Sequence, residues 1–190
     1  WDTSHKFYEP LGEPIESSFL WRFKSGAKLK FEHMANESKA DQRFRGQQIP
    51  RIGIDEVDQI AEETFWFLMS SNRNAHGIKN QIIGTCNPNA ESWVKKLIQW
   101  YIGDDGFPIQ EREGVVRYFF KYGDTIDEIF WGNSREEVYQ KAKSHIDRLY
   151  RKELEGLVSK YDLIKSIVFI RGRVDENKIL LESDPNYIGS

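Results

Sequence analysis

Apolar and polar positions along the chain follow two periods, one typical of strands and one typical of helices. Residues 28–33 alternate, with Leu29 and Phe31 on one face and charged residues on the other. A second apolar run at residues 19–23 precedes them across a segment that contains Gly26. Two such runs around a glycine turn predict an antiparallel β-hairpin with one solvent-facing side.

Four further short apolar runs predict strands, and helical patterns lie between them. The runs are found at residues 49–54, 81–85, 115–120 and 164–170. Strands that alternate with helices form sheets with crossover connections, so the pattern predicts an α/β fold. We expect the strands at 49–54 and 81–85 to be buried. No repeat or linker interrupts the pattern, which predicts a single domain over residues 1–190.

The predicted helices cover three segments, and the third has the clearest start. Apolar residues recur at helical spacing over 60–69 and 93–101. Ser134 and Glu137 have the spacing of a capping box, in which Glu137 reaches back to the Ser134 amide. The apolar stripe that follows is expected to contain Val138, Ala142, His145 or Ile146, and Leu149. Basic and acidic residues alternate along the rest of this helix, which favours a salt-bridged face over a DNA-binding one.

Composition and charge narrow the class of protein. The chain has 27 Lys and Arg against 30 Asp and Glu, and a net charge of -3. That balance excludes a globally basic nucleic-acid binder but leaves room for a local basic patch. No apolar run approaches the ~20 residues that span a bilayer, so we expect no membrane partner. Cys86 is the only cysteine, which excludes an internal disulfide, and the four histidines lack zinc-site spacing.

Two adjacent carboxylates, Asp55 and Glu56, come directly after the apolar run that ends at Ile54. At the carboxyl end of a parallel strand, side chains project into the crevice where ligands bind. In a nucleotide hydrolase the first carboxylate holds the Mg²⁺ shell, and the second orients or deprotonates the attacking water. The same pair could instead cap a helix that begins near Val57. The residues by themselves leave both interpretations open.

The next predicted strand ends in the segment Thr85-Cys86-Asn87-Pro88-Asn89. In a parallel sheet this end lies near the end of the Asp55 strand. A hydroxyl from Thr85 and an amide from Asn87 could contact a γ-phosphate or an attacking water. Asn-Pro-Asn is also a turn signal, so a purely structural role stays open.

Arg45 stands beside Gly46 in a polar segment just ahead of the Asp55 strand. An arginine at such a place could act as an arginine finger on a transferring phosphate. The alternative is a solvated surface arginine, which is the usual environment of this residue type. Arg43 is the second candidate for the same role.

In their order and spacing, these segments resemble the ATPase domain of the large terminase subunit of tailed bacteriophages and prophages. The C-terminal part also resembles the segment that leads from this ATPase domain toward the nuclease domain. The order and spacing of the motifs taken together carry the resemblance. The matching segments are Arg45-Gly46, Ile52–Glu56, Ser71–Arg73, Ile82–Asn89 with Trp93 after it, Phe169–Asn177 and Leu180–Tyr187.

The resemblance implies a viral hydrolase that packages DNA and has a P-loop NTPase-like sheet with flanking helices and the hairpin as an annex. It implies that Asp55, at the end of a Walker B strand, serves Mg²⁺ through water and that Glu56 is the catalytic carboxylate. It also implies that Thr85 and Asn87 couple the state of the γ-phosphate of ATP to motion. Arg45 is then the candidate finger, acting in its own subunit or on a neighbouring one, ahead of Arg43 and Arg73.

The resemblance also implies the partners of the parent protein. These are double-stranded DNA, the small terminase subunit, the portal protein and further copies of the same subunit, in the host cytoplasm at the procapsid portal. A separate nuclease domain, not contained in these residues, would cleave the DNA.

One family element is missing from the sequence, namely the phosphate-binding loop G-x-x-x-x-G-K-[ST]. We therefore expect this chain to be the later part of the ATPase domain, without the Walker A half, and to be inactive by itself. Two alternatives remain: another P-loop ATPase such as a helicase-like core, or a non-enzymatic α/β interaction module in which Asp55 and Glu56 only cap a helix.

Overall fold

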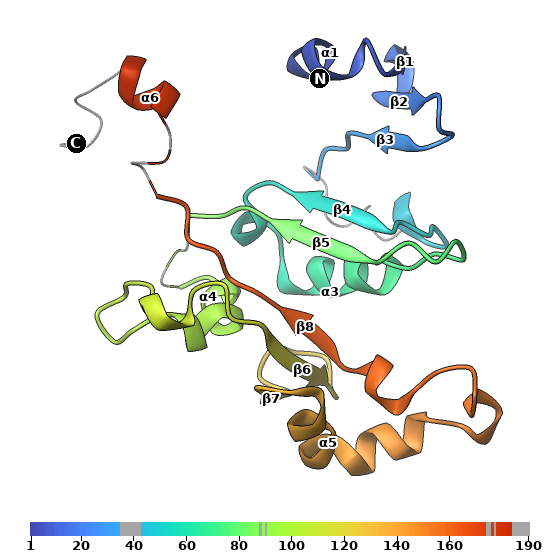
Figure 1. Ribbon diagram of the computed structural model, residues 1–190, viewed down its shortest axis with the longest axis vertical. Coiled ribbons are helices and arrows are strands. Elements are labelled where there is room, and N and C mark those ends of the chain that lie inside the picture. The colour runs from blue at the N-terminus through green and yellow to red at the C-terminus, as the bar shows by residue number, and fades with distance from the viewer. Residues whose placement is uncertain (35–42, 88, 90, 174–175, 177, 184–190) are drawn as a thin grey trace. The chain divides into compact units, whose positions relative to one another are not determined.

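The computed structural model shows a mixed α/β protein with small sheets and short helices, which confirms the predicted class (Figure 1). Its chain divides into two compact units, residues 1–52 with 66–81 and residues 53–65 with 82–190. The single domain stays a prediction. None of the helices in the described part could cross a bilayer, because each is too short or too polar. The structure describes residues 1–34, 43–87, 89, 91–173, 176 and 178–183.

An antiparallel sheet with the strand order β1-β2-β3 opens the first unit. Strands β2 and β3 form the predicted hairpin, with Trp21 paired to Leu29. Gly26 in its turn has a φ of 85°, which glycine adopts without steric cost. Trp21 is fully buried, and its indole N–H donates to the Ser4 hydroxyl at 2.9 Å. The elements are α1 (Asp2–Tyr8), β1 (Gly12–Ile15), β2 (Leu20–Phe23) and β3 (Lys28–Lys30).

Strands β4 and β5 form the pair that positions the candidate site, and their arrows run the same way (Figure 1). The Gln81 amide donates to the Pro50 carbonyl at 2.9 Å, and the Thr85 amide donates to the Ile54 carbonyl at 3.0 Å. From the first bond to the second, the donor moves forward along β5 and the acceptor moves forward along β4. The two strands therefore run parallel, as expected. The elements are β4 (Arg51–Ile54), α3 (Glu62–Ser71) and β5 (Gln81–Gly84).

Burial of β5 was predicted, and that prediction is wrong. Ile83 is 58% exposed, and a Cβ added to Gly53 would meet no atom within 4 Å. These two residues lie two positions before Thr85 and Asp55 and share their face of the pair. On the opposite face a Cβ on Gly84 would lie 2.9 Å from a methyl of the buried Val57, so Val57 packs closely against the strand there. A short apolar run shows that a strand forms but not whether both of its faces are covered.

Asn72, just after α3, holds the starts of β4 and β5 together. Its side-chain amide donates to the carbonyls of Ile49 and Pro50 at 2.9 Å each, and to that of Gln81 at 3.3 Å. The Ile49 amide in turn donates to the Ser71 carbonyl at 3.0 Å. One side-chain amide therefore contacts three backbone carbonyls at the starts of the two strands.

The second unit contains an antiparallel sheet, which differs from the expected alternation of strands in one α/β sheet. The predicted strands at 115–120 and 164–170 form in shorter versions, and β7 was not predicted. The loop from β6 to β7 is too short for a crossover of about a dozen residues, so these two strands pair as a hairpin. The sheet has the order β7-β6-β8, with β6 (Arg117–Lys121), β7 (Ile129–Gly132) and β8 (Lys165–Ile167).

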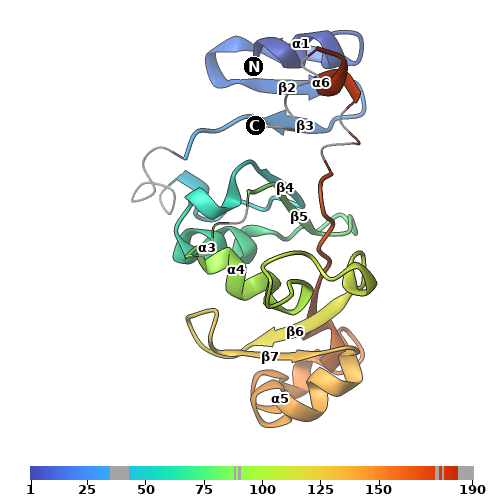
Figure 2. The ribbon, with the colours of Figure 1, turned by 90° about the vertical axis from the view of Figure 1, so that its left-hand side faces the viewer.

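Helix α5 (Arg135–Leu149) connects β7 to β8 and lies against this sheet (Figure 2). Phe120 and Ile164 pack with its stripe, and His145 contacts the rings of Tyr122 and Phe130. Leu149 was expected in the stripe but is 56% exposed, because it is the last helical residue before the chain turns away. The fully buried residues of the stripe are Val138, Ala142 and Ile146.

The start of α5 is correctly predicted, but its capping bond differs by one residue. The Ser134 hydroxyl accepts from the Glu137 amide at 3.1 Å. The Glu137 carboxylate accepts from the Asn133 amide at 2.7 Å, instead of from Ser134. The amide that the Glu137 carboxylate accepts from is therefore determined by the turn after β7 as well as by the helix.

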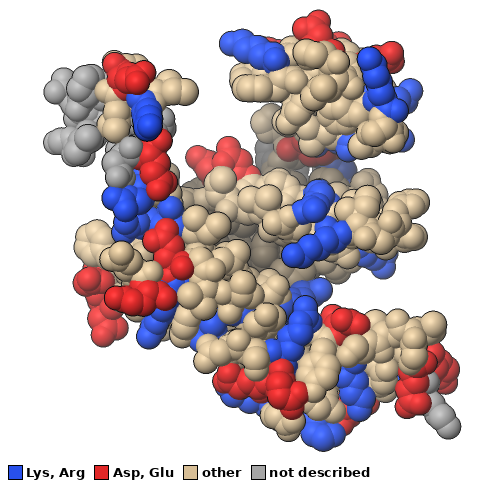
Figure 3. Space-filling view, in the orientation of Figure 1, with Lys and Arg blue, Asp and Glu red and all other residues tan. Residues whose placement is uncertain are grey.

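Charged side chains of α5 form the salt-bridged face that the sequence predicts. Lys141 pairs with Glu137 at 2.7 Å, and Asp147 is bound by both Lys143 and Lys160. These two ammonium groups lower the pKa of Asp147 well below its usual range. Blue and red side chains accordingly alternate over this region (Figure 3). The pairing leaves no single-sign surface on the part of α5 that the figure shows.

Candidate functional site

Thr85, the first residue after β5, holds the turn that carries Asp55 and Glu56. Its amide donates to the Ile54 carbonyl at 3.0 Å, and its carbonyl accepts from the Val57 amide at 2.8 Å. Its hydroxyl donates to the Asp55 carboxylate and accepts from the Glu56 amide at 3.3 Å. The structure therefore brings together Asp55, Glu56 and Thr85, three of the residues predicted from sequence.

Glu56 has a left-handed backbone, with φ 52° and ψ 54°. In the described residues only one other non-glycine residue has a positive φ, namely Phe19. Such a conformation costs about 1 kcal/mol or more and persists only where surrounding bonds maintain it. The hydrogen bonds between Thr85 and the turn maintain this conformation, because they hold the backbone before and after Glu56. The side chain of Glu56 is exposed, so it is free to meet a ligand.

Helix capping does not account for this pair of carboxylates. The segment after it is a single 3-10 turn, Val57–Gln59, whose N-cap Glu56 makes no side-chain capping bond. The Asp55 carboxylate is bound by Thr85 instead. The regular helix α3 begins only at Glu62. Of the two interpretations left open by the sequence, side-chain capping is not observed at Glu56, and a ligand-binding role stays a prediction.

Replacing Glu56 by glycine is expected to raise the free energy of unfolding by about 1 kcal/mol, because glycine adopts the left-handed conformation without strain. Glu63→Gly is the matched control, since Glu63 is an exposed glutamate within α3. This control should lower stability by roughly 0.5–1 kcal/mol. Urea denaturation of the two variants and of the unsubstituted 190-residue chain measures both changes in the free energy of unfolding. Equal losses would show that Glu56 carries no backbone strain.

Asn87 lies two residues beyond Thr85 and is exposed. It makes no hydrogen bond to Asp55 or Glu56 among the residues that the structure describes, and the neighbouring Pro88 lies outside them. Cys86, between Thr85 and Asn87, is partly buried. Burial, and secondarily the charge of Asp58, raises the pKa of its thiol, which favours the unreactive protonated form.

The segment after Asn89 is tied back to the residues that follow the carboxylate pair. Helix α4 (Trp93–Ile98) is capped by Ser92, whose hydroxyl accepts from the Val94 amide at 3.2 Å. The Trp93 indole donates to the Ile60 carbonyl at 2.9 Å, and its ring lies 4.9 Å from that of Phe65. Both ends of the segment that contains Thr85 and Asn87 are therefore anchored.

The arginines considered for catalysis differ in their present contacts. The Arg43 guanidinium donates to Glu32 at 3.1 Å and to the His33 carbonyl at 2.9 Å. Arg45 and Arg73 are exposed and have no side-chain partner in the part of the chain that is described. Gly46, with a φ of 77°, directly follows Arg45. Among the first two candidates, Arg45 is thus the one whose side chain remains available.

Asp55 and Thr85 offer oxygen ligands of the kind that Mg²⁺ prefers. Mg²⁺ is commonly held by one or two protein oxygens and keeps several waters, so a carboxylate beside a hydroxyl fits it. No cluster of three or more His, Cys, Asp or Glu side chains occurs in the described ranges. A dedicated cage of carboxylates is therefore not seen in those ranges.

The fold and the site together define a mixed α/β protein whose polar side chains gather at the carboxyl ends of paired parallel strands. The family model described as "Terminase large subunit, T4likevirus-type, N-terminal" matches residues 3–165. The chain therefore belongs to the large terminase subunit family, as the order of its motifs predicts. No curated protein and no solved structure matches it. The family supports a role in phage DNA packaging over a helicase-like core or an interaction module.

Proposed function

We propose that this chain carries the catalytic carboxylate and the coupling segment of an ATPase that drives DNA packaging. The observation that carries the proposal is the contact between Thr85 and the Asp55–Glu56 turn at the carboxyl ends of β4 and β5. The P-loop NTPase type of sheet is part of this proposal, because ligands of such sheets bind beyond the carboxyl ends of the strands. The family membership also supports a role in DNA packaging.

In this proposal Asp55 and Thr85 hold the outer shell of a Mg²⁺ ion, which when bound neutralises charge on the phosphates of ATP. Glu56 orients the attacking water and accepts its proton. Its backbone is left-handed, and its exposure leaves the carboxylate accessible.

Thr85 is proposed to couple the nucleotide state to motion. Its amide, carbonyl and hydroxyl all bond to the turn between Ile54 and Val57. A change in what the Asp55 carboxylate binds therefore alters the bond of the Thr85 hydroxyl. That change reaches the segment that leads to α4, where Trp93 is anchored to Ile60. Asn87 is proposed to contact the γ-phosphate, and Arg45 to stabilise charge that develops on it.

The parent protein is proposed to translocate double-stranded DNA into a procapsid with the portal protein, the small terminase subunit and further copies of itself. The proposed location is the host cytoplasm at the portal. DNA cleavage is assigned to a nuclease domain outside these residues. The amides and the lysine that bind the phosphates of ATP are likewise proposed to come from residues outside this sequence.

The 190-residue chain by itself is expected to show no measurable ATP turnover. Without a phosphate-binding loop, the transferring group lacks the donors that normally neutralise it. A phosphate-release assay on the purified chain measures this, and the intact parent protein is the positive control. Robust turnover by the chain, lost in the Glu56→Gln variant, would contradict the proposed dependence on outside residues.

A further inference from the structure

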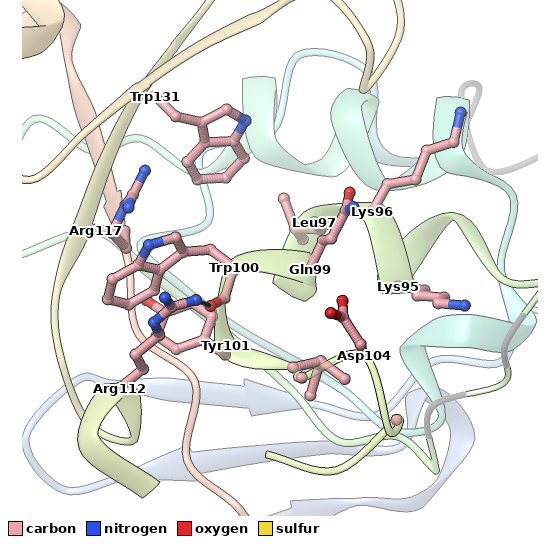
Figure 4. Close-up of a pocket in the computed structure, with 13 residues that line it drawn as sticks. Lys95, Lys96, Leu97, Gln99, Trp100, Tyr101, Asp104, Arg112, Arg117 and Trp131 are labelled. Carbon is pink, nitrogen blue, oxygen red and sulfur yellow. Dashed lines mark hydrogen bonds between the residues drawn. The ribbon is translucent and has the colours of Figure 1, made fainter. Parts of the chain in front are cut away.

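A pocket of about 670 Å³ lies in the second unit and shares no residue with the Asp55 turn (Figure 4). Its lining comes from α4, from the 3-10 turns Gln99–Tyr101 and Gln110–Arg112 and the loop between them, and from β6 and β7. Its charged lining residues are Lys95, Lys96, Asp104, Arg112 and Arg117. Four cations thus face one carboxylate, in a chain whose net charge is -3. We call this the cationic pocket.

Two guanidinium groups are held against the indole ring of Trp100 in the cationic pocket. The guanidinium carbons of Arg112 and Arg117 lie 4.9 and 4.4 Å from the ring centre. Arg112 also donates to the Trp100 carbonyl at 2.7 Å. Stacking on an aromatic ring fixes a guanidinium plane and leaves its edge donors available for a ligand. Figure 4 shows both side chains beside Trp100.

Arg117 has a donor that the protein does not satisfy. Its Nε is buried and has no hydrogen-bond partner. Burial lowers the pKa of Arg117, while the nearby Glu137 raises it and the neighbouring Arg112 lowers it. A buried donor of a charged group that lacks a partner lowers the stability of the fold by more than a typical hydrogen bond raises it. Such groups are uncommon in folded proteins. Because this Nε is buried, a ligand in the pocket would contact Arg117 at the outer edge of its guanidinium and not at Nε.

The other cations of the pocket differ in availability. Lys96 is paired with Asp127, at 2.7 and 3.0 Å from its two oxygens. Lys95 is exposed and has no partner in the described part of the chain. Asp104 is the only carboxylate in the lining, and it is also exposed. The positive charge that remains for a ligand therefore comes from Arg112, Arg117 and Lys95.

We propose that the cationic pocket binds a phosphate group, with Arg112 and Arg117 as the principal donors and Lys95 at the rim. Planar guanidinium forks match phosphate oxygens and bind them with two parallel hydrogen bonds. Phosphodiesters of double-stranded DNA and free phosphates, such as those of a nucleotide, share this chemistry. The site goes beyond the proposed ATPase chemistry and does not depend on it.

The test measures phosphate binding by the full 190-residue chain in two arms. Fluorescence anisotropy of a labelled 20-base-pair DNA is followed at several salt concentrations, and pyrophosphate binding is followed by calorimetry. Arg112→Gln and Arg117→Gln are compared with Arg148→Gln, which removes the same charge from an exposed position on α5. We expect DNA affinity to fall by ~10-fold in each pocket variant and the salt slope to fall by about one, with Arg148→Gln unchanged.

The outcomes separate the two sources of phosphate. Loss of DNA binding in the pocket variants supports contact with the DNA backbone, whereas loss of pyrophosphate binding with DNA binding intact supports a free phosphate. Both bindings unchanged in both variants would overturn the proposal. If Arg117→Gln does not fold, as judged by its melting curve, Arg112→Gln and the exposed Lys95→Gln carry the comparison. Neither binding measurement requires ATP turnover, so failure here is distinct from failure of the ATPase proposal.

Discussion

Replacing Glu56 by glutamine is expected to abolish ATP hydrolysis by the intact packaging protein and to leave its affinity for ATP nearly unchanged. Glutamine keeps the size and shape of the side chain but cannot accept a proton from the attacking water. Loss of a general base lowers turnover by ~10²–10⁴-fold. The left-handed backbone at Glu56 does not depend on the carboxylate, because Thr85 bonds the backbone of the turn. The variant should therefore fold like the parent.

Steady-state phosphate release and nucleotide binding, measured on the same preparation, test this expectation. Glu63→Gln is the matched control, because it makes the same change at another exposed glutamate, in α3. It should hydrolyse ATP at the parental rate. An equal loss of binding and turnover in Glu56→Gln would instead assign Glu56 a structural role, and an equal loss in both variants would point to a general effect of charge.

Replacing Arg45 by alanine is expected to lower turnover in the intact protein by ~10³-fold or more, with little change in nucleotide affinity. An arginine finger acts on charge that develops in the transition state, so it contributes little to binding of the ground state. Arg45 is exposed beside Gly46, whereas Arg43 is engaged with Glu32 and the His33 carbonyl. Arg43→Ala is therefore one control. Arg73→Ala, at the lowest-ranked candidate, is the second, and both should retain turnover.

A mixing experiment decides whether Arg45 acts within its own subunit or on a neighbour. If it acts across a subunit boundary, mixing Arg45→Ala protein with Glu56→Gln protein partly restores hydrolysis. Some interfaces then combine an intact arginine with an intact carboxylate. No restoration would place the action of Arg45 within one subunit. Normal hydrolysis by Arg45→Ala alone would make Arg45 a surface residue and leave Arg43 and Arg73 as candidates.

Local pattern was sufficient for several elements of the fold. The hairpin of β2 and β3, the start of α5 at Ser134 and its buried stripe all depend on residues that are close in sequence. The order of short motifs along the chain also predicts the terminase family, which the family match over residues 3–165 confirms. Glycine turns, caps and periodicity act over a few residues, which is why they can be recognised without knowledge of the tertiary structure.

Pairing and covering of strands could not be predicted in the same way. The sequence shows apolar runs at β5 and β6 but does not show that Ile83 is exposed or that β6 pairs with β7 and β8. The sequence also does not reveal that the Asn72 side chain bonds to the starts of both β4 and β5. Nor does it reveal that Arg112 and Arg117 both lie over the ring of Trp100. These features depend on residues that are distant in the chain, and no local period records them.

The candidate site combines both kinds of information. The sequence alone determined which residue types stand at the strand ends, namely the carboxylates of Asp55 and Glu56 and the hydroxyl of Thr85. Only the tertiary structure decided that Thr85 bonds the turn and that Glu56 takes a left-handed backbone. The physical reason is that parallel pairing brings together two strand ends separated by a helix, and the geometry of the turn arises from the bonds formed there.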